Sequence, residues 1–145
     1  MIRIGKLTDY AFLITNYLVL KQNHLCTIDD ICQATSIPLA TNRKLLKKLV
    51  DAKVVTSYRG SKGGYTLAKT AEEISLADVI YAVEGPISLT ECAKQSTECK
   101  LSNCCELQSN WAFLNNFFEI NLQKVSLKAM SSKLSEQRLE LSSIS

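Results

Sequence analysis

The sequence of 145 residues predicts an α+β domain that is mostly helical, with one β-hairpin and a long helix after it. Three observations lead to this prediction. Apolar residues recur at helical spacing in several stretches of the chain. A short basic helix follows a capping sequence and a proline turn. A glycine-rich turn then joins two runs of β-branched and aromatic residues, which is the pattern of a hairpin.

Two short helices follow a first helix that is predicted over residues 7–22. A capping box of Thr27 and Asp30 opens the second helix. The third helix runs from about Pro38 to Ala52, because proline suits a first turn in which its missing amide needs no partner. A tight turn between two such helices, the second of them basic, predicts a helix-turn-helix.

The third helix has an apolar face and a basic face when its residues are placed about 100° apart. The apolar face holds Leu39, Leu45, Leu46 and Leu49. The basic face holds Ala40, Arg43, Lys44, Lys47 and Lys48. The apolar face must pack on the first two helices, which leaves the basic face to solvent or to a ligand. The helix by itself leaves both interpretations open, since charge runs are commonly just solvated.

Residues 54–58 and 65–67 predict two strands, because they are rich in β-branched and aromatic residues. The glycine-rich turn between them carries Arg59 and Lys62. A hairpin that directly follows a helix-turn-helix is a wing. A nucleotide phosphate loop is excluded, because that motif ends in Gly-Lys-Ser or Gly-Lys-Thr and opens a helix.

The sequence divides into four segments. The winged helix-turn-helix occupies residues 1–84, a cysteine-rich loop 85–105, a long helix 106–130 and a flexible tail 131–145. The long helix repeats apolar residues in alternating steps of four and three, as in the seam of a dimerising coiled coil. The residues of this predicted dimer seam are Leu107, Trp111, Leu114, Phe118 and Val125.

Charge is distributed unevenly along the chain. Residues 1–70 hold 11 Lys and Arg against 4 Asp and Glu, whereas residues 71–145 hold 6 against 10. A basic first half predicts a polyanionic partner, because Lys and Arg gain affinity by displacing phosphate counterions.

Several function classes are excluded. With one histidine and no nucleophile paired with a base, we expect no enzyme and no small-molecule substrate. The longest apolar run, residues 10–20, is too short to span a membrane. Asp9 interrupts the resemblance to a secretory signal, so we expect a cytoplasmic protein without a membrane partner.

Three cysteines in the loop, Cys92, Cys99 and Cys105, are separated by six and five residues, and Cys104 adjoins the last of them. Zinc sites usually present pairs two to four residues apart. Wider, evenly spaced thiols suit an iron–sulfur cluster. A disulfide framework is disfavoured in a reducing compartment. The spacing alone leaves a cluster, zinc and free thiols as alternatives.

Over about residues 1–130 the chain resembles the bacterial Rrf-type winged-helix regulators, the group of the IscR and NsrR proteins. Its similarity is greatest to the regulators of the SUF iron–sulfur assembly operon. The shared motifs are Leu7-Thr8-Asp9-Tyr10-Ala11, Arg59-Gly60-Ser61-Lys62-Gly63-Gly64-Tyr65, Val83-Glu84-Gly85, and the three-cysteine loop followed by Asn110-Trp111.

The resemblance implies a homodimeric repressor of iron–sulfur assembly genes that carries a 2Fe-2S or 4Fe-4S cluster. The family's three cluster ligands correspond to Cys92, Cys99 and Cys105. Cys105 fits better than Cys104, because it keeps the six-residue interval to Trp111. Some members add a histidine where Gln108 stands here, and others add a carboxylate from the partner subunit, a position that Asp9 matches.

The resemblance also implies contacts with a near-palindromic double-stranded operator. Base-edge contacts would come from Ala40, Thr41, Arg43 and Lys44. Arginine suits bidentate bonding to guanine. Lys47 and Lys48 would meet phosphates, Arg59 would enter the minor groove, and Lys62 would lie beside it in the wing.

Two other hypotheses remain open from the sequence. One is a regulator of the same fold that responds to thiol oxidation or nitric oxide. The other is an iron–sulfur or zinc carrier protein whose basic helix is incidental.

Overall fold

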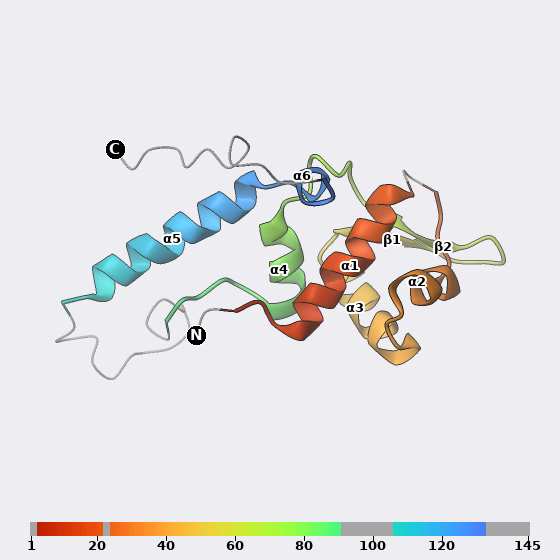
Figure 1. Cartoon of the computed structure of the whole chain (residues 1–145), viewed down its shortest axis with the longest axis horizontal. Helices are drawn as coiled ribbons and strands as arrows, with labels where there is room; N and C mark the ends of the chain where they lie inside the picture. The colour runs from red at the N-terminus through yellow and green to blue at the C-terminus, as the bar shows by residue number, and fades with distance from the viewer. Residues whose placement is uncertain (1–2, 22–23, 91–105, 133–145) are drawn as a thin grey trace.

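The computed structural model describes residues 3–21, 24–90 and 106–132 (Figure 1). The first helices, α1, α2 and α3, span Lys6–Leu20, Ile28–Thr35 and Leu39–Asp51. A hairpin follows, formed by β1 (Val55–Tyr58) and β2 (Gly64–Leu67). The later helices, α4, α5 and α6, span Leu76–Glu84, Gln108–Lys124 and Leu127–Met130. This order confirms the mostly helical α+β fold with a helix-turn-helix and a hairpin wing.

Helix α1 lies at the centre of the winged domain and contacts α2, α3, α4, α6 and β2. In Figure 1 the hairpin and α5 extend from opposite sides of this domain. The core takes apolar side chains from each of the helices that surround α1; its most deeply buried members include Ala11, Ile14, Ile31, Leu45, Leu46, Leu49 and Val79. No helix in the described part of the chain is long and apolar enough to cross a membrane.

The apolar face of α3 differs from the prediction at one end. Leu45, Leu46 and Leu49 are fully buried, but Leu39 is 40% exposed. Asn42, one helical turn later on the same face, is fully buried instead. The first turn of α3 therefore projects beyond the core, and a polar side chain closes the core at that end.

The second helix begins with the predicted capping box. Thr27 Oγ1 accepts a hydrogen bond from the amide of Asp30 at 3.2 Å, and the Asp30 carboxylate accepts one from the amide of Thr27 at 2.9 Å. The hydrogen bonds from the Thr27 side chain and amide lower the pKa of Asp30. Ser36 then ends the helix in the left-handed conformation, with φ of 57°. These local bonds set where the turn into α3 begins.

The wing is an antiparallel hairpin in which Val55 pairs with Leu67 and Tyr58 pairs with Gly64. Cys26 lies on the other side of β2, where its amide and carbonyl bond to Tyr65 at 2.9 and 2.8 Å. A Cβ on Gly64 would lie 2.7 Å from the carbonyl oxygen of Cys26. Glycine is therefore required at this position, because two backbone segments of the protein lie too close together there for a side chain.

The predicted helix over residues 106–130 is interrupted near its end. Helix α5 ends at Lys124, and Val125 adopts an extended conformation. The carbonyl of Val125 accepts a hydrogen bond from Leu76 at 2.9 Å, and the amide of Leu127 donates to Ile74 at 2.8 Å. These bonds turn the chain onto the winged domain, where Leu127 is buried. Val125 consequently does not continue the apolar seam of α5.

We expect the substitution Gly64→Ala to lower the free energy of unfolding by about 2 kcal/mol or more, because backbone atoms of Cys26 would have to move. Urea denaturation of the purified protein measures this change. Ser61→Ala, at an exposed position in the adjoining hairpin turn, is the matched control and should stay within about 0.5 kcal/mol of the original protein. Equal stabilities for the two variants would contradict the proposed contact.

Candidate nucleic-acid interface

The solvent-facing side of α3 is basic. Arg43, Lys44 and Lys47 are exposed there, together with Ala40, and Thr41 beside them is half-buried. They are held outward because the opposite face of the helix packs its leucines into the core. The structure thus gathers five of the six predicted α3 contact residues on an accessible surface.

Lys48 is the one predicted contact residue of α3 that is not on this surface. Its side chain is half-buried, and Nζ donates a 2.6 Å hydrogen bond to the carbonyl of Val83 at the end of α4. The last carbonyls of a helix carry partial negative charge, which attracts an ammonium group. Lys48 therefore ties α3 to α4, and its charge is directed away from the surface of Arg43 and Lys47.

The turn of the hairpin supplies a second basic surface. Arg59 and Lys62 are both exposed in it, and Gly60 adopts a φ of 110° that favours glycine. A hollow of about 230 Å³ lies between α3 and the hairpin, which also contact each other. Arg43 and Lys47 line it from α3, and Ser57 and Tyr65 line it from the strands. The wing and the basic face of α3 thus border one continuous surface.

Asn42 positions the first turn of α3 and was not predicted as a functional residue. Its Nδ2 donates to the carbonyl of Ile37 at 2.8 Å and to Sγ of Cys32 at 3.1 Å. The amide side chain thereby joins α3 to the turn and to α2. The sequence does contain a signal for this role: Asn42 is a polar residue at helical spacing from Leu39 and Leu46, on the otherwise apolar face.

The predicted cluster ligands Cys92, Cys99 and Cys105 lie outside the described residues. Asp9, the fourth candidate, is exposed in the first turn of α1. Within the ranges that the structure describes, no group of three or more His, Cys, Asp or Glu side chains could hold a metal ion.

The segment that leads to the cysteines is attached to α5 by Asn115. Its Oδ1 accepts a hydrogen bond from the amide of Leu89 at 3.0 Å, and its Nδ2 donates to the carbonyl of Ile87 at 3.1 Å. Helix α5 begins at Gln108, two turns before Asn115. Ile87 and Leu89, which precede the cysteines, therefore lie beside the first half of the helix that follows the cysteines.

Helix α5 carries an exposed apolar surface. Leu107, Trp111, Leu114 and Phe118 are 57, 37, 39 and 42% exposed, and α5 has no buried residue. Phe113 and Ile120, which the spacing of four and three did not include, are also exposed. Large apolar side chains gathered in this way are typical of an interaction surface.

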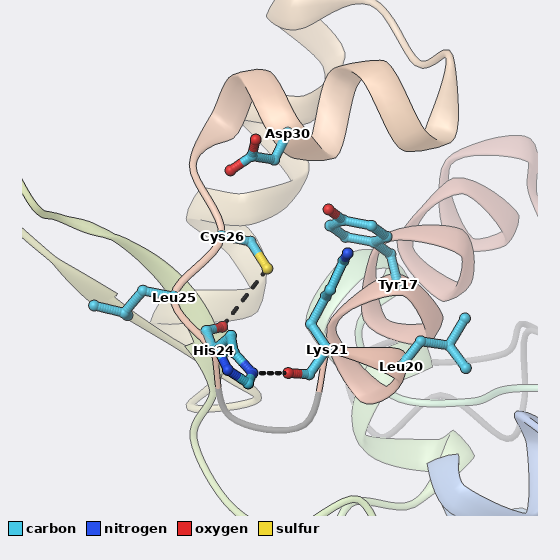
Figure 2. A pocket seen from close by; sticks show the side chains of 7 residues that line it. All are labelled: Tyr17, Leu20, Lys21, His24, Leu25, Cys26 and Asp30. Carbon is cyan, nitrogen blue, oxygen red and sulfur yellow. Dashed lines mark hydrogen bonds between the residues drawn. The ribbon is translucent and has the colours of Figure 1, made fainter.

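A separate hollow lies between the end of α1 and the start of α2 (Figure 2). Within it, the Lys21 ammonium lies 5.3 Å from the centre of the Tyr17 ring, and Nδ1 of His24 contacts the carbonyl of Lys21 at 2.7 Å. Sγ of Cys26 donates to the carbonyl of His24 at 3.6 Å. Burial raises the pKa of the Cys26 thiol, so the thiol keeps its proton.

Comparison with known proteins agrees with this geometry. The Rrf2 family of iron-dependent transcriptional regulators matches residues 4–133. NsrR of Oceanobacillus iheyensis is 33% identical over 107 residues, which cover 72% of this chain and 73% of the relative. IscR of Photorhabdus laumondii is 32% identical over 101 residues, which cover 70% of this chain and 61% of the relative.

Among solved structures, CymR, the global cysteine regulator of B. subtilis, matches with a TM-score of 0.71 and 24% identity. The match covers 93% of this chain and 100% of that chain. At this identity the likeness shows the fold alone. The family match over nearly the whole chain, together with the helix-turn-helix and its wing, shows that this chain belongs to the Rrf2 family of DNA-binding transcriptional regulators, which are not enzymes.

Proposed function

We propose that this chain is a homodimeric repressor of iron–sulfur cluster assembly genes, including those of the SUF system. It binds a near-palindromic double-stranded operator through α3 and the wing. The observation that carries the DNA-binding part is the exposed basic face of α3 beside a hairpin whose turn presents Arg59 and Lys62. A major groove admits one α-helix, and a wing beside that helix can contact a neighbouring groove.

The accessible residues divide into three roles. Arg43 and Lys44, with the small residues Ala40 and Thr41 near the start of α3, read base edges. Lys47 and Lys62 contact phosphates, which position the protein without specifying sequence. Arg59 enters the minor groove, where a narrow A·T-rich groove concentrates negative potential. Lys48 is left out of this set, because its ammonium is bonded to Val83.

Dimerisation through α5 follows from its unburied apolar side chains, from Leu107 to Phe118. A second copy of the chain would cover these residues and set two α3 helices at a fixed spacing. Each subunit would then read one half of the operator. The symmetry of the operator would mirror the two-fold symmetry of the protein.

An iron–sulfur cluster, 2Fe-2S or 4Fe-4S, is held by Cys92, Cys99 and Cys105, with Asp9 of the partner subunit as fourth ligand. Two observations support this assignment. Thiolates are the usual donors to such clusters, and three of them would leave one position for a further ligand. Asn115 anchors Ile87 and Leu89, shortly before the cysteines, to α5, the proposed dimer helix, which begins shortly after the cysteines. When bound, the cluster supplies sensitivity to iron supply, oxidants or nitric oxide.

The family assignment favours this function over a metal carrier, because the basic face of α3 then has a role. The hypothesis of a regulator that responds through its thiols without a cluster is distinguished by assay of iron and acid-labile sulfide.

A comparison of two neighbouring lysines tests the DNA surface. Lys47→Ala should weaken binding to operator and random DNA alike and reduce the slope of log affinity against log salt by about one unit. Lys48→Ala should leave that slope unchanged and instead lower thermal stability, because α3 loses its bond to Val83. Fluorescence anisotropy over a salt series measures both slopes. Equal changes of slope would contradict the assigned surface.

Charged substitutions test the dimer helix. The double variant Leu114→Glu, Phe118→Glu should be monomeric, because two carboxylates would be buried in the interface. Its operator affinity should fall by about 100-fold or more, since the two half-sites are no longer bound by linked subunits. Sedimentation velocity measures the assembly state. A double variant that still sediments as a dimer would show that the interface lies elsewhere.

Serine substitutions test the cluster ligands. Protein prepared without oxygen should be coloured and carry iron with acid-labile sulfide. Cys92→Ser, Cys99→Ser or Cys105→Ser should abolish the colour, whereas the corresponding variants of Cys26, Cys32 and Cys104 should keep it. Asp9→Ala should leave a labile or spectrally altered cluster. A colourless protein that holds stoichiometric zinc would overturn the assignment.

A further inference from the structure

The hollow between α3 and the hairpin is lined almost entirely by polar and charged side chains. Three elements, α3, β1 and β2, contribute to its walls. The lining residues are Arg43, Lys47, Val50, Asp51, Ser57 and Tyr65. All of them except Val50 carry a polar or charged group, so the hollow suits a polar ligand better than an apolar one.

Two hydroxyl groups face this hollow from the hairpin. Ser57 and Tyr65 are direct partners across the two strands. Partners in an antiparallel pair place their side chains on the same face, and both residues line the hollow. The amide and carbonyl of Tyr65 also bond to Cys26 at 2.9 and 2.8 Å. The backbone that carries the Tyr65 side chain is therefore held from both edges.

The donors of the hollow are not used within the described part of the chain. Neither the Ser57 nor the Tyr65 hydroxyl forms a hydrogen bond with a residue that the structure describes, and Lys47 forms no ion pair there. An ammonium group and two hydroxyls thus face one space. A phosphate group can use all three, because its oxygens accept hydrogen bonds and carry negative charge.

We propose that this hollow binds one phosphate group of the DNA backbone, through Nζ of Lys47 and the hydroxyls of Ser57 and Tyr65. The inference rests on the proposed DNA surface, to which it adds two uncharged residues. Both hydroxyls donate to phosphate oxygens, and Lys47 supplies the charge. Because the donors come from the helix and from the hairpin, one phosphate would fix the position of the wing relative to α3.

Asp51 determines which kind of phosphate the hollow takes. Its carboxylate is exposed and lines the same space, where it repels an anion. With Arg43 and Lys47 it leaves the hollow one net positive charge. A phosphodiester in duplex DNA carries one negative charge, whereas a terminal phosphate monoester carries about 1.5 to 2 at neutral pH. The charge of the hollow therefore favours the DNA backbone.

The experiment titrates the full-length protein into fluorescent duplex DNA of random sequence over a salt series. Tyr65→Phe should weaken binding about fivefold or more, because one hydrogen bond to a charged group is lost. The slope of log affinity against log salt should not change, since no charge is removed. Asp51→Asn should strengthen binding and steepen that slope.

Tyr58→Phe is the matched control for Tyr65→Phe. Tyr58 adjoins Ser57 in β1, so its side chain lies on the other face of the hairpin, and it is 55% exposed. Its affinity for DNA should equal that of the original protein. Ser57→Ala, at an exposed position, is a second variant that should fold normally and bind DNA about threefold or more weakly.

The outcomes separate this inference from the proposed function. Original affinity in both Tyr65→Phe and Ser57→Ala, with weaker binding by Lys47→Ala, would overturn the phosphate site and leave the DNA surface standing. Unweakened binding by Lys47→Ala would contradict both. Inorganic phosphate, added at constant ionic strength, should not compete with DNA. Competition that Tyr65→Phe abolishes would assign the hollow to free phosphate and refute the proposal.

Discussion

The C-terminal turn of α4 is the point on which the arrangement of the winged domain depends. The carbonyl of Val83 accepts the hydrogen bond from Lys48 of α3, and the next residue, Glu84, accepts hydrogen bonds from the amide of Gly5 and the hydroxyl of Thr8. A cation thus meets the negative end of one helix and a carboxylate meets the positive end of another. Helices α1, α3 and α4 are held together at one place by polar bonds that supplement the apolar core.

The same helix also determines how α5 is attached. The hydroxyl of Tyr81 donates to the carboxylate of Glu119, and burial together with that carboxylate raises the pKa of Tyr81 to about 12. The backbone bond between Leu76 and Val125 joins the other end of α4 to the end of α5. Many of the large apolar side chains of α5 stay exposed in this arrangement and are available for a partner. The segment that leads to the cysteines begins at the C-terminal turn of α4.

Much of this arrangement follows from local patterns in the sequence. The capping boxes at Thr27 and Ser75, the helix that ends before Gly85, and the hairpin around Gly60 depend on residues within a few positions of one another. Helical periodicity also separates the basic side of α3 from its leucines. The assignment of Cys92, Cys99 and Cys105 is of another kind, because it combines spacing with the resemblance to a family.

Contacts between residues far apart in the sequence determine other features of the structure. Lys48 belongs to the basic face by periodicity, yet its ammonium bonds to a carbonyl 35 positions away. The long helix stops at Lys124 because the chain bonds to Leu76 and Ile74, and Gly64 is required by the backbone of Cys26. The sequence by itself determined the two strands, the helices other than the end of α5, and which face of α3 is charged, because those depend on short-range periodicity and capping. Tertiary structure decided which of those charges reach the surface, since burial and hydrogen-bond partners depend on packing between elements far apart in the chain.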